Sequence, residues 1–279
     1  MKNYSILVNS CDAYSDAWPM FFFLLKKHWQ NVGGGMPRVY LNCETLQYHD
    51  DDIEIINLNH ADTRAWGERL LKCLDEIDDE IILMMLEDYY YEADIKTDII
   101  AKCVDYMEAD KKILAFQLEP TGEVFTNKTI IEESQYPGFV KRKRFAYFKL
   151  VAGPTLWRKS ELIRYTNKND TPWDWEFFGS LRTWLNSNKI YCWTSFTDRI
   201  FDFDGEHGGA IHRGKWVGYK IEELSKKYNF PFDYGTREVE YDWIKEGSFF
   251  NVPPFYKRLR NVIRNRSKFV FEIIRGLWI

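Results

Sequence analysis

The clearest feature of the hydrophobic pattern is a run of apolar residues from Ile81 to Leu86, with acidic residues on both sides. A short apolar run of this kind is typical of a strand buried on both faces, and it is short for a buried helix. Two carboxylates, Glu87 and Asp88, and three tyrosines follow directly. In open α/β sheets, ligands bind beyond the carboxyl ends of the strands. The two acids are therefore candidates for holding a hard cation or a sugar hydroxyl, unless they only end the strand and face water.

Similar apolar stretches alternate with amphipathic ones through the first 118 residues. Strands are predicted at 4–9, 38–42, 53–58, 81–86 and 113–118. The helices predicted between them have one apolar face through Trp18, Phe22, Leu25 and Trp29, a second through Leu70, Leu71, Leu74 and Ile77, and a third stretch at 94–107. This alternation predicts an α/β fold with a mostly parallel central sheet flanked by helices.

The pattern changes after residue 118, where proline and glycine interrupt it. A basic run at 141–144 follows, which we interpret either as a solvated loop or as an anion-facing loop near the mouth of a site. Further helices are predicted from Ser160 and from Trp173 to about Ser187, and a further strand at 189–194. We divide the chain into an α/β half at 1–118, a second half of the same domain at 119–220 and a helical extension at 221–279.

Composition adds two constraints. Aromatic residues make up 17% of the chain, with 11 Trp and 17 Tyr, and surplus Trp and Tyr are typical of sites for sugars or bases. The net charge of −4 argues against a nucleic-acid partner. This value conceals a contrast, because residues 255–279 carry seven bases and one acid, a net +6, so the rest of the chain carries −10.

The cysteines and the termini bear on location. The five cysteines form no CxxC pair and no metal-type spacing, which fits a reducing compartment. The sequence shows no signal-peptide pattern, and no run approaches the roughly 18 apolar residues of a membrane-spanning helix. These features predict a cytoplasmic protein.

Several candidate groups have chemistry that fits together. A carboxylate near an acceptor hydroxyl can act as a general base. Basic side chains and a divalent cation can stabilise a leaving diphosphate. The combination predicts group transfer from a nucleotide-activated donor. The groups concerned are Asn9, Asp12, Glu87 and Asp88 at strand ends, Asp174 and Glu176 on an aromatic background, and His207, His212, Arg213 and Lys215 in a later loop.

The order of these motifs resembles a known family. A buried strand ending in acids, then "LVAGPTLWRKSELI" as a strand and turn, then an acid opening a helix in "WDWEFFGS", is similar to inverting glycosyltransferases of the GT-A fold. The segments "SILVNSCDAYSDAW", "WGERLLKCL", "LEDYYY", "TLWRKSEL" and "HRGKW" resemble bacterial glycosyltransferases of capsule and surface polysaccharide synthesis. The resemblance covers about residues 4–220.

The resemblance implies a role for each matching position. It implies nucleotide-sugar binding by the end of the first strand and by basic side chains further on. It places a metal site for Mg²⁺ or Mn²⁺ at Glu87–Asp88, completed by a late histidine, and a catalytic base at Glu176. The implied nucleotide-sugar-binding residues are Asn9, Ser10, Asp12, Arg64, Arg69, Asp88, Arg213 and Lys215, and the implied histidine is His207 or His212.

The sequence departs from the family pattern at the metal motif, which is not Asp-x-Asp. Adjacent residues of a regular strand point to opposite faces, so Glu87 and Asp88 can share a cation only if the strand breaks between them. A metal-independent enzyme that uses Arg and Lys also remains open. Helical residues two apart face different ways, so only one of Asp174 and Glu176 can face the site. Asp174 is therefore the alternative base. For Arg69, a surface pair with Asp62 or Asp75 is the alternative role.

Two other functional classes compete with the glycosyltransferase. A nucleotidyltransferase would need a basic glycine-rich stretch near the N-terminus, and residues 9–20 contain no Gly, Lys or Arg. A catalytically inactive carbohydrate- or nucleotide-binding protein of the same fold is the other alternative.

The last 25 residues form a basic amphipathic pattern. Apolar residues recur there at intervals of three and four, with bases in many of the gaps. Such a helix can lie in the headgroup region of an anionic membrane, where a lipid-linked acceptor would be found. The alternative is a helix docked on the domain with its apolar face buried.

Overall fold

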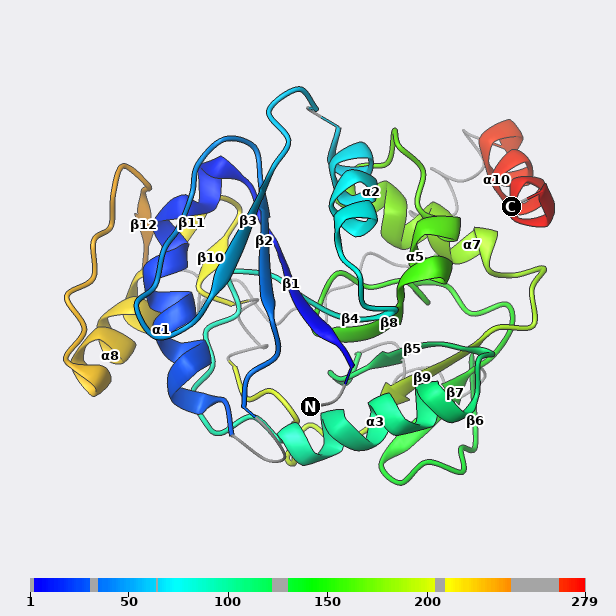
Figure 1. Cartoon of the computed structure of the whole chain (residues 1–279), viewed down its shortest axis with the longest axis horizontal. Helices are drawn as coiled ribbons and strands as arrows, with labels where there is room; N and C mark the ends of the chain where they lie inside the picture. The colour runs from blue at the N-terminus through cyan, green and yellow to red at the C-terminus, as the bar shows by residue number, and fades with distance from the viewer. Residues whose placement is uncertain are drawn as a thin grey trace.

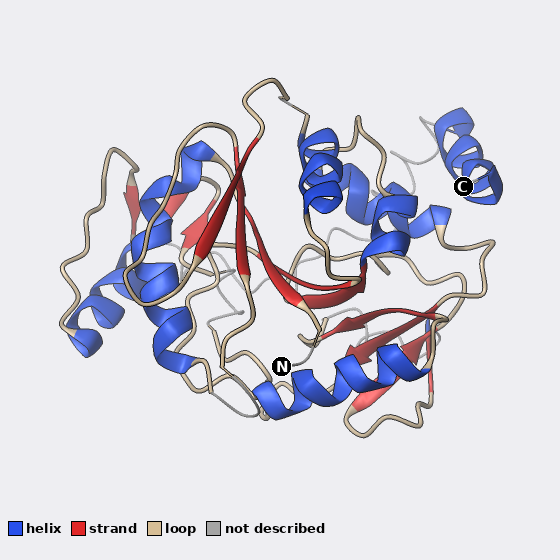
Figure 2. Ribbon diagram, in the orientation of Figure 1, coloured by secondary structure: helices blue, strands red, loops and turns tan. Residues whose placement is uncertain are grey.

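The structure, a computed structural model, describes residues 3–30, 35–63, 65–121, 130–203, 209–241 and 266–278. A nine-stranded sheet forms its centre, in the order β3-β2-β1-β4-β8-β5-β9-β7-β6 (Figure 1). Figure 2 shows helices packed around this sheet and a small second sheet, β10-β11-β12, at one end of the molecule. This is the α/β architecture, a central sheet flanked by helices, that the sequence predicts.

The first half of the sheet is parallel. The parallel strands are β1 (Ser5–Asn9), β2 (Val39–Cys43), β3 (Ile55–Asn59) and β4 (Ile81–Met85). Successive side chains of a strand point to opposite faces. Accordingly Ile6 and Val8 enter one hydrophobic core and Leu7 enters the other, so the apolar run of β1 supplies both faces of the sheet.

Helices cover each face because their apolar sides complete these two cores. The helices α1 (Trp18–His28) and α3 (Thr97–Ala109) pack on the core that contains Ile6. The helices α2 (Trp66–Glu76) and α5 (Lys159–Tyr165) pack on the core that contains Leu7. A short 3₁₀ turn, η1 (Asp12–Ala17), connects β1 to α1, whose first turn accommodates Pro19.

The second half of the sheet is mixed, so the prediction of a mostly parallel sheet holds only for part of it. β8 (Thr155–Arg158) runs antiparallel between β4 and β5 (Ile113–Gln117), and β9 (Lys189–Trp193) is parallel to β5. At the edge, β7 (Phe139–Arg142) and β6 (Ile131–Glu132) are antiparallel. In the segment predicted as strand and turn, the strand β8 follows the turn at Gly153–Pro154 instead of preceding it.

The basic run at 141–144 is not a loop throughout, because β7 includes its first two residues. Arg142 is buried, and its guanidinium donates to the carbonyl of Tyr147 at 2.6 Å and to Thr121 Oγ1 at 3.1 Å. The interpretation of the whole run as solvated is therefore wrong for Arg142, whereas Lys143 and Arg144 are exposed.

The helix predicted from Trp173 to about Ser187 is shorter and irregular. It consists of α6 (Pro172–Asp174), a π-helical turn η3 (Trp175–Gly179) and α7 (Ser180–Arg182). Gly179 lies where the chain approaches Leu150 closely, since a Cβ there would come within 2.6 Å of a Leu150 methyl carbon. Turns of π-helix occur often at functional sites.

The C-terminal part contains β10 (Ile211–His212), β11 (Lys215–Val217), α8 (Gly218–Tyr228), β12 (Val239–Glu240) and α10 (Arg266–Trp278). α10 lies at the opposite end of the long axis from β12 (Figure 1). Within the described residues, no helix combines the length and the apolar character that crossing a bilayer requires.

Candidate active site

The predicted site residues that follow strands β1 and β4 lie at one edge of the sheet. Because β1, β2, β4 and β5 run in one direction, the segments that follow them leave the sheet along the same edge. This is the edge at which open α/β sheets bind ligands.

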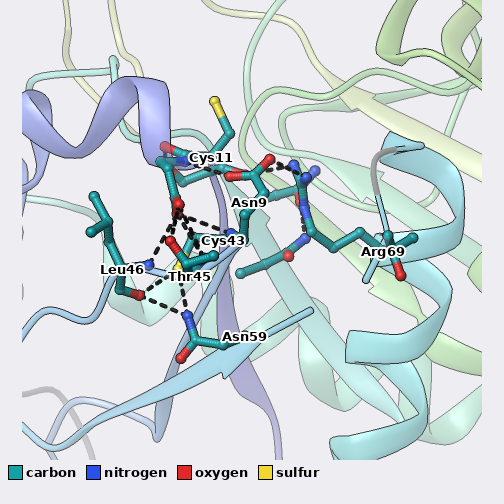
Figure 3. Close-up of polar contacts among 12 residues, drawn as sticks. Asn9, Cys11, Cys43, Thr45, Leu46, Asn59 and Arg69 are labelled. Carbon is teal, nitrogen blue, oxygen red and sulfur yellow. Dashed lines mark hydrogen bonds and ion pairs between the residues drawn. The ribbon is translucent and has the colours of Figure 1, made fainter. Parts of the chain in front are cut away.

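The ends of β1 and β2 are joined by a dense network of hydrogen bonds (Figure 3). The carboxylate of Asp12 accepts from the backbone N–H groups of Glu44 at 3.1 Å, Thr45 at 3.0 Å and Leu46 at 3.2 Å. Burial alone would raise the pKa of Asp12, but the hydrogen bonds from Thr45, Leu46 and Glu44 outweigh burial and lower it. Asp12 therefore fixes the loop after β2 as an ionised carboxylate. Deeper in the network, Asn42 Nδ2 donates to Asn9 Oδ1 at 2.5 Å.

Arg69 reaches this network from α2. Its guanidinium is buried, donates to Ser10 O at 3.1 Å and forms an ion pair with Glu44. The alternative of a surface pair with Asp62 or Asp75 is wrong, because Asp62 pairs with Lys72 at 2.6 Å. Arg69 Nε is buried and meets no hydrogen-bond acceptor among the described residues. A cation is thus placed beside the predicted nucleotide-sugar-binding residues.

The acids of the central motif lie in a turn and not on a strand. β4 ends at Met85, and Glu87 and Asp88 form the turn that follows, so the alternation of a regular strand does not separate them. Glu87 is buried and hydrogen-bonded to Ser10, whose Oγ also accepts from Trp18 Nε1 at 2.8 Å. Asp88 keeps some solvent contact, yet its Oδ1 is buried and has no hydrogen-bond partner in the described part of the chain.

Burial raises the pKa of both carboxyls, and the neighbouring charge of Asp88 adds to the effect on Glu87. Two hard oxygen ligands with an unsatisfied, buried Oδ1 fit Mg²⁺ or Mn²⁺. Among the described residues, however, no group of three His, Cys, Asp or Glu side chains is arranged as a metal site. The predicted third ligand His207, like Arg64, lies outside the described residues.

A basic residue that the sequence analysis missed faces these acids. The charge of Arg237 opposes the raised pKa values of Glu87 and Asp88. Its guanidinium donates to both carboxylate oxygens of Asp16, at 2.8 and 2.9 Å, to Ala13 O at 2.7 Å and to Gly214 O at 2.9 Å. No local motif marks Arg237, since its partners are more than 20 or more than 220 residues away.

The bases predicted to bind the donor are placed differently. Lys215 pairs with Glu238 at 2.9 Å and Glu240 at 3.7 Å on the outer side of the small sheet. Arg213 is exposed at the tip of the β10–β11 hairpin. His212 lies in β10, where burial and the charge of Arg213 lower its pKa.

Tyr89 connects the acids of β4 with the second half of the domain. Its phenol ring stacks on Phe203, with ring centroids 4.5 Å apart, and lies against the backbone of Gly153. Burial raises the pKa of the Tyr89 phenol, and the charges of Asp88, Glu176, Glu119 and Glu87 raise it further, in that order. Hydrogen bonds also bring two of these carboxyls close to the ring, because Glu176 accepts from Ala152, the neighbour of Gly153, and Glu119 accepts from Phe201, two residues before Phe203.

Glu176, the predicted base, lies in the π-helical turn. Its Oε1 accepts from the backbone N–H of Ala152 at 2.9 Å, which joins the turn to the loop before β8. Burial raises the pKa of Glu176, and the hydrogen bond from Ala152 opposes the shift. Asp174 lies on α6, where its N–H is capped by Thr171 Oγ1 at 3.1 Å. Of the two candidate bases, Glu176 is the one whose charge raises the pKa of the Tyr89 phenol.

Glu119 is a further carboxyl at this edge that the sequence analysis missed. It follows β5, and its Oε1 accepts from the N–H of Phe201 at 3.2 Å. Burial raises the pKa of Glu119, and the charge of Arg199 opposes the shift. An available signal was the acid just after the predicted strand 113–118, the same signal that identified Glu87.

Comparisons with known proteins give a limited result. Neither the known protein families nor the curated proteins include a match to this sequence. Solved structures with a similar arrangement include S. aureus TarS 1–349 in complex with UDP, at 11% identity and a TM-score of 0.45, covering 70% of this chain and 58% of that one. Another is the mannosyltransferase PcManGT from Pyrobaculum calidifontis in complex with GDP-Man and Mn²⁺, at 15% identity and a TM-score of 0.47, covering 69% and 54%.

A third is a CMP:2-keto-3-deoxy-manno-octonic acid synthetase in complex with CTP, at 11% identity and a TM-score of 0.41, covering 69% of this chain and 90% of that one. The chain thus spans less than two thirds of TarS 1–349 and of the mannosyltransferase. All three of these structures contain a bound nucleotide or nucleotide sugar. At such TM-scores they assign no activity to this chain, so a functional argument rests on its own residues.

Proposed function

We infer that this protein is a glycosyltransferase that moves a sugar from a nucleotide-diphosphate sugar to a carbohydrate or lipid-linked acceptor. The observation that carries this inference is the grouping of Asp88, Glu119 and Glu176 around Tyr89 at the carboxyl edge of the sheet. Carboxyls from three segments lie near one another there, and Arg69 lies at the adjoining strand ends. A site of this kind can hold a diphosphate and a sugar side by side.

Each side of the site has a distinct task in this proposal. The ends of β1 and β2, with Arg69, take the nucleotide, for which Asn9, Ser10 and Asp12 are the candidate contacts. Glu87 and Asp88 would hold Mg²⁺ or Mn²⁺, which when bound neutralises charge on the donor diphosphate. If the enzyme is metal-independent, Arg69 and Arg237 are the described cations closest to that role.

Glu176 is the proposed base. As an acceptor hydroxyl attacks the anomeric carbon, Glu176 takes its proton, the new carbon–oxygen bond forms, and the bond to the diphosphate oxygen breaks. The nucleoside diphosphate leaves with the electron pair, and one displacement of this kind inverts the anomeric centre. The raised pKa of Glu176 suits this step, because a base with a pKa closer to the working pH takes a proton more effectively.

The biological setting is also a proposal. The resemblance of the motifs to surface-polysaccharide glycosyltransferases favours a role in bacterial capsule or surface polysaccharide synthesis. A lipid-linked acceptor would bring a cytoplasmic enzyme to the inner face of the membrane, and we include peripheral contact through residues 255–279 in the proposal. The net charge of the chain supports no nucleic-acid partner.

Calorimetric titration with UDP, GDP and CMP and their sugars, with MnCl₂ and then with chelator, tests the function. We expect one nucleotide to bind, and its sugar to be hydrolysed or transferred. Nucleotide-sugar binding that persists in chelator would indicate a metal-independent transferase. No binding of any nucleotide sugar would overturn the proposal, and binding of CTP or another nucleoside triphosphate with release of pyrophosphate would favour the nucleotidyltransferase. Binding without turnover on any acceptor would favour the inactive binding protein.

A further inference from the structure

The C-terminal helix α10 packs on the domain with its polar side. Glu272 is buried, and its Oε2 accepts from Arg182 Nε at 2.6 Å. Gly276 O accepts from Asn186 Nδ2 at 2.9 Å, and a Cβ at Gly276 would lie 2.2 Å from Arg182 O. The absence of a side chain at Gly276 is therefore what lets the helix approach α7. Among the side chains of α10 that the structure describes, an ion pair and the close approach at Gly276 make this interface.

The other side of α10 is apolar and faces outward. Val270, Phe271 and Ile274 are 53%, 61% and 46% exposed. Their spacing of three and four places them on one side of the helix, opposite Glu272 and Gly276. An ordinary surface helix buries its apolar side and exposes its charged side. Val270, Phe271 and Ile274 are instead exposed, so the alternative of a docked helix with its apolar face buried is wrong for these three residues.

A basic recess adjoins the docked helix. It has a volume of about 500 Å³, and Asn186, which holds Gly276, is part of its wall. Arg144 is fixed at this recess by donating to Trp184 O at 2.6 Å and to Leu185 O at 3.2 Å, so its charge is held in place by uncharged partners. The recess is lined by Glu132, Lys141, Arg142, Arg144, Leu185, Asn186, Ser187 and Asn188.

We propose that the outward face of α10, Val270, Phe271 and Ile274, together with the neighbouring basic recess, is the surface by which this protein docks on an anionic lipid bilayer. The inference rests on the proposed function only in giving such docking a purpose, delivery of a lipid-linked acceptor. Exposed apolar side chains enter the acyl boundary, while bases remain among the headgroups. Charge complementarity selects the bilayer as occupant, because the chain from residue 255 carries a net +6 and the exposed Arg144 adds a further positive charge at the recess, where Lys141 is paired with Glu132 at 3.5 Å.

Vesicle flotation of the full chain tests the proposal. Wild-type protein is expected to float with vesicles containing phosphatidylglycerol at low salt, less at high salt, and weakly with pure phosphatidylcholine. The double substitution Phe271→Gln and Ile274→Gln should lower the partition coefficient about tenfold or more, because two apolar side chains no longer enter the bilayer. Arg144→Gln should lower it about severalfold, and only at low salt.

Matched variants act as controls. Tyr241→Gln changes an exposed aromatic residue on the far side of the molecule, and Lys102→Gln removes an exposed base on α3, so neither should change flotation. The melting temperature of the α10 double variant should equal that of the wild type, because both side chains are exposed and Glu272 is retained. Nucleotide binding by all variants should also be unchanged, which separates this proposal from the proposed function.

Three outcomes would overturn the proposal. One is equal flotation of the wild type and the double variant. The second is wild-type protein that fails to float on anionic vesicles at low salt. The third is a concentration-dependent dimer in ultracentrifugation that the double variant abolishes while flotation is absent, which would make a second copy of this chain the occupant of the face.

Discussion

At the scale of single residues, Glu87 and Asp88 lower the stability of the folded protein in two ways, through their burial and through their mutual repulsion. Both carboxyls are enclosed by protein, and they are neighbours in one turn. Ser10 and Arg237 offset only part of this cost, and Asp88 Oδ1 stays without a partner among the described residues. Such strain is expected where a ligand supplies the missing partner, since a cation would favour the ionised forms that burial disfavours.

Asp88→Asn should therefore stabilise the metal-free protein at high pH. The pKa of the Asp88 carboxyl is raised on folding, so the free energy of unfolding falls as the pH rises from the ordinary carboxyl range to the raised pKa. The amide of Asp88→Asn does not ionise, so this variant does not lose stability in this pH range. The Tm difference, Asp88→Asn minus wild type, should grow by about 2–4 °C or more between about pH 5 and about pH 9, equivalent to about 1 kcal/mol.

Thermal melts in chelator measure this difference, and excess MnCl₂ should reverse its sign at high pH if the pair holds a cation. Asp98→Asn, in an exposed pair with Lys102, is the control. A Tm difference that does not change with pH would show that the Asp88 carboxyl is not desolvated in solution.

Glu176→Gln should leave nucleotide binding nearly intact and lower kcat by about 10²–10⁴-fold. The amide keeps the shape and the acceptor oxygen for Ala152 N–H, but it cannot take a proton. In the wild type, turnover should fall as the pH drops through the raised pKa of Glu176, because the base must be ionised to act. Initial rates measure the expected loss in kcat, and donor affinities of the two proteins test whether nucleotide binding is retained. Asp174→Asn is the matched variant, and a larger loss in Asp174→Asn than in Glu176→Gln would transfer the role to Asp174.

At the scale of elements, the fold shows where local sequence signals suffice. The strands β1, β2, β4, β5 and β9 lie within two residues of their predicted bounds, since each is a short apolar run between polar residues. The π-helical turn and the antiparallel β8 were not predicted, because both depend on packing against distant segments. For example, Leu150 N donates to Ser180 Oγ at 2.9 Å and so joins the loop before β8 to the turn that carries Glu176.

The same limit applies to the candidate site. Asp88 and Glu176 could be proposed from their places after a strand and at a helix start. Arg237 and the orientation of α10 could not, because periodicity shows that a face is apolar but not what covers it. The partners of Arg237 on η1 are known only once the chain has folded back over more than 220 residues.

The interface of α10 should contribute to stability through Glu272. Arg182 is buried and donates to Asp170 at 2.6 and 2.9 Å as well as to Glu272. Glu272→Gln removes one of the two charges that compensate a buried guanidinium, at a cost of about 1–3 kcal/mol and several degrees in Tm. Asp98→Asn should change the Tm little, because an exposed pair contributes little. Equal, unchanged melting of both variants would show that α10 leaves the domain in solution.

At the scale of the whole molecule, Arg237 ties the small sheet to the edge of the large one. Its guanidinium donates hydrogen bonds to Asp16 and Ala13 on η1 and to Gly214 on the β10–β11 hairpin. The guanidinium carbon also lies 4.5 Å from the ring centroid of Tyr14. Ala210 N, just before that hairpin, donates to Asp88 O at 2.7 Å. The hairpin is therefore connected to the candidate metal turn through Ala210 and to η1 through Arg237.

Arg237→Lys should loosen this connection without unfolding the main sheet. A lysine retains the charge but cannot present the planar fork that serves Asp16 and two carbonyls at once. Losing about 2 kcal/mol of local stability would raise amide exchange about 30-fold in the small sheet, at Trp216 and Val217, and leave β1 unaffected. Lys215→Gln, which changes a solvent-exposed base in β11 of the same sheet that is paired with Glu238 and Glu240, should not raise exchange at these amides. Nucleotide-sugar affinity should fall in Arg237→Lys, because the positive charge beside Glu87 and Asp88 is no longer held in a fixed position. Unchanged exchange at Trp216 and Val217 would mean that the core contacts of Trp216, and not Arg237, hold the small sheet in place.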